Sequence, residues 1–285
     1  MTEPNNNIAP AIQVVDLVKR FDQRAVLDGV NLKIMPGETM VIMGGSGCGK
    51  STLLRHMIAS LTPNEGRVEL FQKDLAQLEP EDLNEVRKRF GILFQSGALF
   101  NSMTVGENVA LPLREHTDLD DSTIEVITLI KLELVGLRYA VDLMPSEISG
   151  GMKKRAGLAR ALALDPEILF YDEPSAGLDP VTSSEIDQLM MDLSDKLGVT
   201  TVVVTHEMDS AFRIADRMAM LDHGKVLKIG AREEFESIRD GDPTGDETND
   251  LIRQFLRGDP EGPLTARRLD SEYEDAILEA ADGRG

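Results

Sequence analysis

The sequence is poor in cysteine, tryptophan and histidine, and these shortages exclude several kinds of chemistry. Its 285 residues include one cysteine, Cys48, no tryptophan and four histidines. A single cysteine excludes an internal disulfide and a zinc site built from several thiolates. The histidines, at positions 56, 116, 206 and 223, lack the spacing of metal ligands. Neither paired-thiol redox chemistry nor structural zinc is expected.

Positive charge and long apolar runs are also scarce. Thirty Lys and Arg stand against 50 Asp and Glu, which gives a formal net charge of −20. Since nucleic acids and anionic membranes attract basic surfaces, we expect no nucleic-acid partner and no unaided adhesion to a membrane. No stretch approaches the roughly 18 apolar residues of a spanning helix, and the start, MTEPNNNIAP, does not resemble a signal peptide. The sequence predicts a cytoplasmic chain that reaches a membrane only through partners.

A glycine-rich loop is the first strong motif that the sequence does contain. It follows the apolar run 39–43 and precedes a helical pattern at 50–59. Its residues are Gly44, Gly45, Ser46, Gly47, Cys48, Gly49, Lys50, Ser51 and Thr52. They fit G-x-x-x-x-G-K-[ST], in which backbone N–H groups hold phosphates, the lysine reaches the β and γ oxygens, and the serine hydroxyl binds Mg²⁺. The loop predicts a site for a nucleotide with Mg²⁺.

Two adjacent carboxylates follow a second apolar run. Residues 168–171 are typical of a strand buried in a parallel sheet, so Asp172 and Glu173 lie at its carboxyl end, where ligands of such sheets bind. We expect Asp172 to hold Mg²⁺ and Glu173 to deprotonate the attacking water, a step worth about 10² to 10⁴ in rate. An isolated Asp-Glu pair is more often an acidic turn, but Lys50 upstream favours the catalytic interpretation.

A second helix start carries residues that suit an anion. Ser149, Gly150, Gly151 and Met152 open a helical pattern at 150–164, and a serine cap followed by glycines favours phosphate binding. Because the first loop already serves one nucleotide, we expect this start to complete the site of a second copy of the chain, so that two-fold symmetry gives two shared nucleotides. Without the other motifs, a simple turn would be the better interpretation.

Two single residues complete the predicted pocket. His206 directly follows an apolar run at 200–205, where it would touch the γ-phosphate. Phe21 precedes the glycine-rich loop and is placed to stack on adenine, an interaction worth roughly 1–3 kcal/mol. A lone histidine or phenylalanine at a strand end is more often structural, so both assignments depend on the companion motifs.

The periodicity along the chain indicates its organisation. Alternation at 12–18 and 30–34 predicts antiparallel strands, whereas the apolar runs predict a parallel sheet. Residues 82–164 have a mostly helical pattern, which predicts a helical insertion. We expect a flexible tail at 1–10, an ATPase domain at 11–240 and an acidic extension at 241–285 that contacts a second copy or a partner. Within it, a helix is predicted near 251–256, and 267–281 fits a solvated helix or disorder equally well.

Taken in order, these motifs resemble those of ATP-binding subunits of ABC transporters. The resemblance makes 44–52 the Walker A motif, 149–153 the signature and 168–173 the Walker B motif. It implies an α/β P-loop NTPase fold with a RecA-like core, an N-terminal antiparallel β subdomain, a helical insertion and a C-terminal extension, with ATP and Mg²⁺ as cofactors. It assigns catalysis to Glu173, His206, Lys50 and Gln95, metal binding to Ser51, Gln95 and Asp172, and a nucleotide contact to Asp179. Ile148-Ser-Gly-Gly-Met replaces the usual Leu-Ser-Gly-Gly-Gln, and Phe21 a common Tyr, but neither change removes a catalytic group.

A finer resemblance, in segments 91–117, 143–147 and 252–258, is to ATPases of the bacterial Mla (maintenance of lipid asymmetry) phospholipid transporters. It implies a peripheral homodimer at the cytoplasmic face of the inner membrane. The implied partners are an MlaE-type permease, an MCE-domain lipid-binding protein and a STAS-domain protein. We expect Leu99, Phe100 and Met103 to form an apolar cluster for the permease, although core packing explains them equally well.

Three alternatives share part of this pattern. The ATPase of a small-solute importer, for example for amino acids, would carry every catalytic motif. A soluble ABC ATPase acting on ribosomes or DNA usually has two cassettes or a coiled-coil insertion, and this chain has one cassette and an acidic balance. A catalytically idle subunit is disfavoured because Lys50, Asp172, Glu173 and His206 are all present.

Overall fold

The computed structural model describes residues 8–22 and 24–265. Contacts along the chain divide it into two units, 1–228 and 229–285. The division precedes the boundary predicted at residue 240, because α8 (Arg232–Asp240) packs on α9 (Glu247–Arg257) and so belongs with the extension. Within the described part of the chain, none of the helices combines the length and hydropathy needed to span a bilayer.

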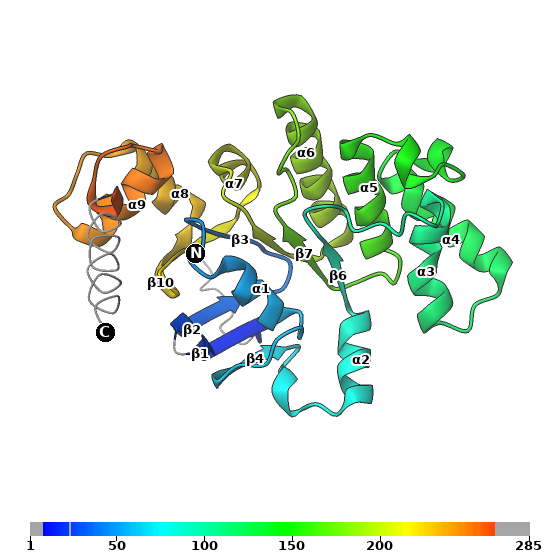
Figure 1. The fold of residues 1–285 in the computed structure, drawn as a ribbon, viewed down its shortest axis with the longest axis horizontal. Coiled ribbons are helices and arrows are strands. Elements are labelled where there is room, and N and C mark those ends of the chain that lie inside the picture. The colour runs from blue at the N-terminus through cyan, green and yellow to red at the C-terminus, as the bar shows by residue number, and fades with distance from the viewer. Residues whose placement is uncertain (1–7, 23, 266–285) are drawn as a thin grey trace, which may run out of the picture. The chain divides into compact units, whose positions relative to one another are not determined.

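A six-stranded sheet with the order β10-β9-β3-β8-β7-β6 forms the main layer (Figure 1). The strands are β3 (Thr39–Gly44), β6 (Phe90–Leu93), β7 (Ile168–Asp172), β8 (Thr200–Val204), β9 (Arg217–Asp222) and β10 (Lys225–Ala231). The pairs β3–β8, β3–β9, β7–β8 and β6–β7 are parallel. Every residue of β3 and β8 is buried, which explains their continuous apolar sequences. The predicted parallel sheet is confirmed.

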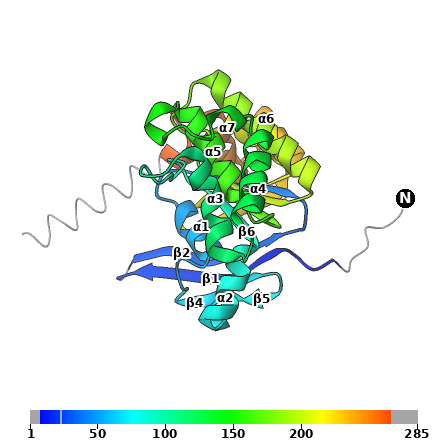
Figure 2. The same ribbon diagram turned by 90° about the vertical axis from the view of Figure 1, so that its right-hand side faces the viewer.

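A smaller antiparallel sheet has the order β2-β1-β4-β5. Its strands are β1 (Ile12–Phe21), β2 (Arg24–Ile34), β4 (Glu65–Leu70) and β5 (Lys73–Asp74). Both predicted strands are confirmed and are longer than the alternation indicated. Helix α1 (Lys50–Met57) packs against strands of both sheets and lies between them in Figures 1 and 2. The N-terminal sheet therefore covers the helix that follows the glycine-rich loop.

The predicted helical insertion needs one correction. Its helices are α2 (Pro80–Lys88), α3 (Val105–His116), α4 (Asp121–Leu134) and α5 (Gly150–Ala161). Between α2 and α3, however, strand β6 joins the parallel sheet beside β7. Gly91 makes this possible, since a Cβ there would lie 2.2 Å from the carbonyl oxygen of Ala161. The insertion proper is therefore α3–α5, whose shared core includes Ala110, Leu113 and Ile124.

Among the described residues, two further helices complete the first unit, and two belong to the second. Helix α6 (Pro180–Leu197) begins after β7, and α7 (Met208–Ile214) begins after β8. In the extension, α9 confirms the helix predicted near 251–256, and Phe235 of α8 is buried together with Leu251 and Ile252. Residues 1–7 of the tail predicted at 1–10, and the helix considered at 267–281, lie outside the described residues.

Candidate active site

Four neighbouring parallel strands bring the predicted motifs to one edge of the sheet. Ile42 of β3, Val204 of β8 and Asp172 of β7 lie at the same level across the ladder. Strands are spaced about 4.8 Å apart, so the loop after β3 and the carboxylate of β7 are separated by roughly 10 Å. His206 follows β8 and Gln95 follows β6 at the same edge. This edge therefore collects segments that are far apart in the sequence.

Two glycines of the loop are required by close backbone contacts. Gly44 has φ +150°, and a Cβ there would lie 2.2 Å from the carbonyl oxygen of Leu221. Gly49 has φ +110°, and its Cβ would lie 2.8 Å from the carbonyl oxygen of Val26. Strands β9 and β2 thus hold the loop from two sides. The result is a narrow cradle of backbone N–H groups, which suits a phosphate.

Lys50 is buried in this loop, and no carboxylate among the described residues pairs with it. Its ammonium donates to the carbonyl oxygens of Gly44 and Gly45, at 2.7 and 2.9 Å. Neutral carbonyls compensate a buried charge only partly, so an anion in the cradle would bind this ammonium more strongly. Ser51 and Thr52 follow in the first turn of α1, with Ser51 exposed. The residues of this loop fit the phosphates of a nucleoside triphosphate.

Glu173 has all of its polar groups engaged. Its N–H donates to the carbonyl oxygen of Val204 at 2.9 Å. Its Oε1 pairs with the His206 ring Nδ1 at 2.9 Å, and its Oε2 accepts the His206 backbone N–H at 3.4 Å. The Glu173 side chain is 14% exposed and that of His206 is 61% exposed. Solvent therefore reaches the histidine, which holds a shielded carboxylate next to the phosphate cradle.

Asp172 is the residue best placed to bind a divalent cation. Burial raises the pKa of its carboxyl group, and the neighbouring charge of Glu173 raises it further. No group of three or more His, Cys, Asp or Glu side chains suited to a metal occurs among the residues that the structure describes. Mg²⁺ prefers few protein carboxylates together with phosphate oxygens. Asp172, the Ser51 hydroxyl and the exposed Gln95 fit that requirement.

The starts of α5 and α6 are in contact. The Ser149 hydroxyl caps α5 by accepting the Met152 N–H at 3.3 Å, and Ser149 and Gly150 are exposed. A Cβ on Gly151 would lie 2.6 Å from Cγ2 of Thr182, which is in the first turn of α6. Asp179 caps α6, and its hydrogen bond from the Thr182 side chain lowers the pKa of its carboxyl group. The signature and Asp179 therefore belong to one exposed surface.

Two predicted nucleotide contacts have specific placements. The Cys48 side chain is buried, burial raises its pKa, and its sulfur lies 3.9 Å from the Lys50 ammonium. Only the Cys48 backbone can therefore serve a ligand in the loop. Phe21 is 45% exposed at the end of β1, with the Lys19 ammonium 5.3 Å from its ring centroid. An exposed ring on this hairpin is suited to stacking on a base.

Sequence reasoning missed two cations on α5. Lys154 is buried, and its ammonium donates to the carbonyl oxygen of Glu173 at 3.0 Å; burial lowers the pKa of this lysine. Arg160 donates to the carbonyl oxygens of Gly97 and Ala98, in the loop after Gln95, at 3.2 and 2.7 Å. The available signal was the position of these cations among small and apolar residues on one helix. Both side chains hold backbone of the candidate site.

Comparison with known proteins decides the family. The family model described as ABC transporter matches residues 27–176, more than half of the chain. The chain belongs to the ABC transporter family. Its predicted fold class is confirmed by solved cassettes of this family. The cbiO1 structure from Clostridium perfringens, part of the ABC transporter complex cbiONQ, is 30% identical with a TM-score of 0.75. The match covers 80% of this chain and 91% of the cbiO1 chain.

The dimeric post-hydrolysis structure of the cassette MJ0796, bound to ADP and Pi, is 31% identical with a TM-score of 0.71. The match covers 78% of this chain and 98% of the MJ0796 chain.

Curated relatives in the ABC transporter family are similar along almost the whole chain. The intermembrane phospholipid transport system ATP-binding protein MlaF of Haemophilus influenzae is 40% identical over 94% of this chain and 98% of its own. The probable ribonucleotide transport ATP-binding protein mkl of Mycobacterium leprae is 42% identical over 96% of this chain and 78% of its own. The chain is therefore an ABC ATP-binding subunit that resembles MlaF, and it binds and hydrolyses ATP.

Proposed function

We propose that the chain is the ATPase of a transporter that moves phospholipids and maintains outer-membrane lipid asymmetry, working at the cytoplasmic face of a bacterial inner membrane. One structural observation supports the hydrolytic role: the Glu173 carboxylate is held by His206 beside the phosphate cradle. Similarity to MlaF over nearly all of both chains supports the lipid substrate. The similarity to mkl supports a second candidate, an ATPase for a small solute such as a ribonucleotide.

The proposed chemistry is general-base hydrolysis. The loop N–H groups and the Lys50 ammonium hold the phosphates, while Ser51, Gln95 and Asp172 hold Mg²⁺, which neutralises phosphate charge when bound. Glu173 orients the attacking water and takes its proton. His206 fixes the rotamer of that carboxylate through two hydrogen bonds and lies near the γ-phosphate. Phe21 stacks on the adenine.

We propose that two copies enclose two ATP molecules. In this arrangement Ser149, Gly150, Gly151, Met152 and Asp179 of one copy complete the nucleotide site of the other. ATP closes the dimer because it binds the closed state more tightly than the open state. The extension at 241–285 contributes a contact to the second copy or to a partner. Closure moves the permease, and hydrolysis resets it.

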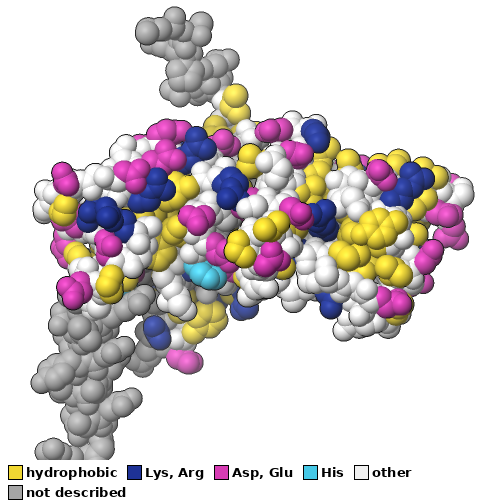
Figure 3. All heavy atoms as spheres, turned by 90° about the horizontal axis from the view of Figure 1, so that it is seen from above, with side chains coloured by type: hydrophobic (Ala, Val, Ile, Leu, Met, Phe, Trp, Pro, Cys, Tyr) yellow, Lys and Arg dark blue, Asp and Glu magenta, His cyan; other side chains and the backbone are white. Residues whose placement is uncertain are grey.

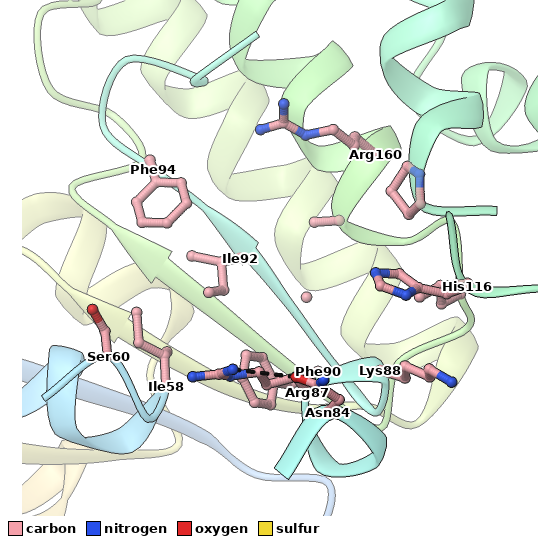
Figure 4. Close-up of a pocket in the computed structure, with 14 residues that line it drawn as sticks. Ile58, Ser60, Asn84, Arg87, Lys88, Phe90, Ile92, Phe94, His116 and Arg160 are labelled. Atoms are coloured by element: carbon pink, nitrogen blue, oxygen red, sulfur yellow. Dashed lines mark hydrogen bonds between the residues drawn. The ribbon is translucent and has the colours of Figure 1, made fainter. Parts of the chain in front are cut away.

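A cleft of about 510 Å³ is suited to a segment of the permease (Figure 4). Ile58, Phe90, Ile92 and Phe94 provide apolar walls, and Arg160 comes from α5 on the opposite side. Phe94 is 39% exposed and immediately precedes Gln95. A helix of an MlaE-type permease inserted here would therefore press on the loop that carries Gln95.

The apolar cluster predicted for the permease differs from the residues that form this cleft. Leu99, Phe100 and Met103 do not line it. The buried Asn108 side chain instead binds the backbone of Phe100, Met103 and Thr104, which fixes this segment beside α3. Phe100 is nevertheless 51% exposed. The cleft beside Phe94 is thus the better candidate for permease docking.

A second exposed apolar surface lies on the insertion. Val126, Ile130 and Leu134 of α4 are spaced four residues apart and are 57%, 53% and 38% exposed. In Figure 3, hydrophobic side chains also gather toward the right-hand end of the face, over the insertion, between charges of both signs. We propose that this surface of α4 binds a STAS-domain protein. An MCE-domain lipid-binding protein joins the complex through the permease.

The test is purification of the tagged chain from its own membranes, followed by reconstitution of the complex in phospholipid vesicles. We expect co-purification of a permease and an MCE-domain protein, and ATP-dependent movement of fluorescent phospholipid. In Glu173→Gln, ATP binding and dimerisation should persist while hydrolysis falls by about 10² to 10⁴. Recovery of a different permease, with hydrolysis stimulated by ribonucleotides or amino acids, would move the assignment to a solute transporter. Wild-type turnover in Glu173→Gln would overturn the role of Glu173.

A further inference from the structure

We propose that Lys154 is a positioning residue that ties the Glu173 backbone to the helix whose start forms half of the second nucleotide site. The inference rests on the role proposed for Glu173. Helix α5 would then serve two nucleotides at once: its first residues face the ATP held by the partner copy, and Lys154, one turn later, holds the hydrolytic residue of its own copy. Four residues of helix separate Gly150 and Lys154 by only about 6 Å along the axis.

The hydrogen bond between Lys154 and Glu173 is short and buried, and its acceptor belongs to the proposed catalytic residue. Lys154 is 4% exposed, and its ammonium donates to the carbonyl oxygen of Glu173 at 3.0 Å. The carboxylates of Glu173, Asp172 and Glu207 interact favourably with its charge. A buried ammonium is costly unless it is bonded, so this side chain has a strong preference for one position. It links the insertion to the end of β7.

Glu173 needs external support because its backbone is strained. Its φ is +51°, in the left-handed region that non-glycine residues seldom occupy. The Glu173 N–H bonds to Val204 on β8, and the Glu173 carbonyl oxygen accepts the Ala176 N–H at 3.3 Å as well as the Lys154 ammonium. Of these three bonds, the one from Lys154 comes from a different part of the fold, the helical insertion. A shift of α5 therefore acts on the Glu173 peptide.

This arrangement gives a physical route from dimer closure to hydrolysis. When the signature residues meet the partner's nucleotide, α5 is fixed as a rigid element, and Lys154 fixes the Glu173 peptide with it. Misplacement of a catalytic group by about 1 Å costs on the order of 10²-fold in rate. Loss of the Lys154 bond should consequently lower kcat while ATP binding to the Walker A loop is unchanged.

The chain offers a matched control for a purely structural lysine. Lys131 of α4 is also buried, at 7% exposure, and also belongs to the insertion. Its ammonium binds the Asp165 carboxylate, in the turn between α5 and β7. Lys131→Met removes a buried charge from the same insertion without touching Glu173. It reports how far loss of stability alone changes turnover.

The experiment measures four quantities on the full-length chain in its purified complex: kcat and KM for ATP, affinity for a fluorescent ATP analogue, ATP-dependent association of the two copies, and Tm. The variants are Lys154→Met, Lys154→Arg, Lys154→Gln, Lys131→Met and Glu173→Gln. We expect Lys154→Met to lower kcat about 10- to 100-fold with unchanged nucleotide affinity and association. Lys154→Arg, which keeps the charge and donors, should recover most of the rate. If Lys154→Met does not fold, Lys154→Gln, which keeps a neutral donor, takes its place.

The outcomes separate this inference from the proposal on which it rests. Normal kcat in Lys154→Met or Lys154→Gln would overturn the positioning role, as would an equal loss of kcat in Lys131→Met. A fall in Tm and in nucleotide affinity together, without recovery by Lys154→Arg, would show a structural role and also overturn it. Normal hydrolysis in Glu173→Gln would remove the role of Glu173 itself and the inference with it.

Discussion

The starts of α1 and α5 are both expected to meet phosphate, yet the fold builds them differently. Helix α1 begins after Gly49, which has a left-handed conformation and provides no side-chain cap, and the backbones of β2 and β9 hold its loop in place. Lys50 is already buried inside that loop. Helix α5 begins with a side-chain cap from Ser149, and its Ser149 and Gly150 are exposed.

This difference indicates which site is complete within one chain. The α1 start has a cradle, a buried cation and carboxylates at the neighbouring strand ends, so we expect one copy to be sufficient to bind a nucleotide. The α5 start has a capped helix and an exposed surface, and its neighbour is the start of α6 at Thr182. Variants in the loop and first turn of α1 should therefore change nucleotide affinity, whereas variants at the exposed start of α5 should change only what requires a second copy.

The largest effect is expected from Gly44→Ala. The added Cβ would meet the carbonyl oxygen of Leu221 at 2.2 Å and the Cys48 sulfur at 2.7 Å, so the loop must move. We expect ATP affinity to fall at least about 100-fold, measured by titration with a fluorescent ATP analogue. Gly47→Ala is the control, because its φ is +75° but its Cβ would have no neighbour within 4 Å in the part of the chain that the structure describes. An equal loss in both variants would contradict the packing argument.

A smaller and more selective effect is expected from Gly151→Ala. Its Cβ would lie 2.6 Å from Cγ2 of Thr182, which pushes the two helix starts apart. Alanine favours a helix, so α5 itself should stay intact. We expect ATP affinity to be unchanged and turnover of the complex to fall about 10-fold, since misplacement of a contacting group lowers the rate. Assays of binding and hydrolysis on the same preparation check this.

Thr182→Ser provides the control for that variant. Serine removes Cγ2 and keeps the hydroxyl that bonds to Asp179. Thr182→Ser alone should leave turnover unchanged, and the double variant with Gly151→Ala should regain most of the lost rate. Reduced ATP affinity in Gly151→Ala would break the proposed division between the two helix starts.

Much of the contrast between the starts of α1 and α5 was predictable from the sequence, because each helix start is encoded by a local pattern of residues. The strand–loop–helix order around Lys50 and the serine cap at Ser149 depend on residues that are close in the chain. The burial of Cys48, the placement of β6 and the bond from Lys154 to Glu173 depend on tertiary contacts instead. Lys154 and Glu173 are separated by 19 positions, and Glu173 and His206 by 33. Motif order predicted that His206 joins the site, but no periodicity predicts which carbonyl a buried lysine binds.

The smallest expected effect is a pH dependence confined to the α1 side. His56, in the last turn of α1, is 1% exposed, and its Nδ1 faces the carbonyl oxygen of Thr52 at 2.7 Å. Its Nε2 has no hydrogen-bond partner within the described residues. Burial is the main cause that lowers the pKa of this imidazole below its usual 6.5, and the Lys19 charge adds to it. The folded state therefore favours neutral His56.

The sign of the pH effect follows from that direction. Above about pH 6.5 both folded and unfolded chains hold a neutral imidazole, and the full stabilisation is present. As the pH falls below this value, the unfolded chain takes up a proton before the folded chain does, so the free energy of unfolding decreases. We expect Tm to fall between pH 7.5 and 5.5, and the fall to be smaller in His56→Gln. Helix α5 contains no histidine. As the pH falls, nucleotide affinity should therefore decrease before the association of the two copies does. Loss of association first, at unchanged nucleotide affinity, would place the acid-sensitive element outside α1.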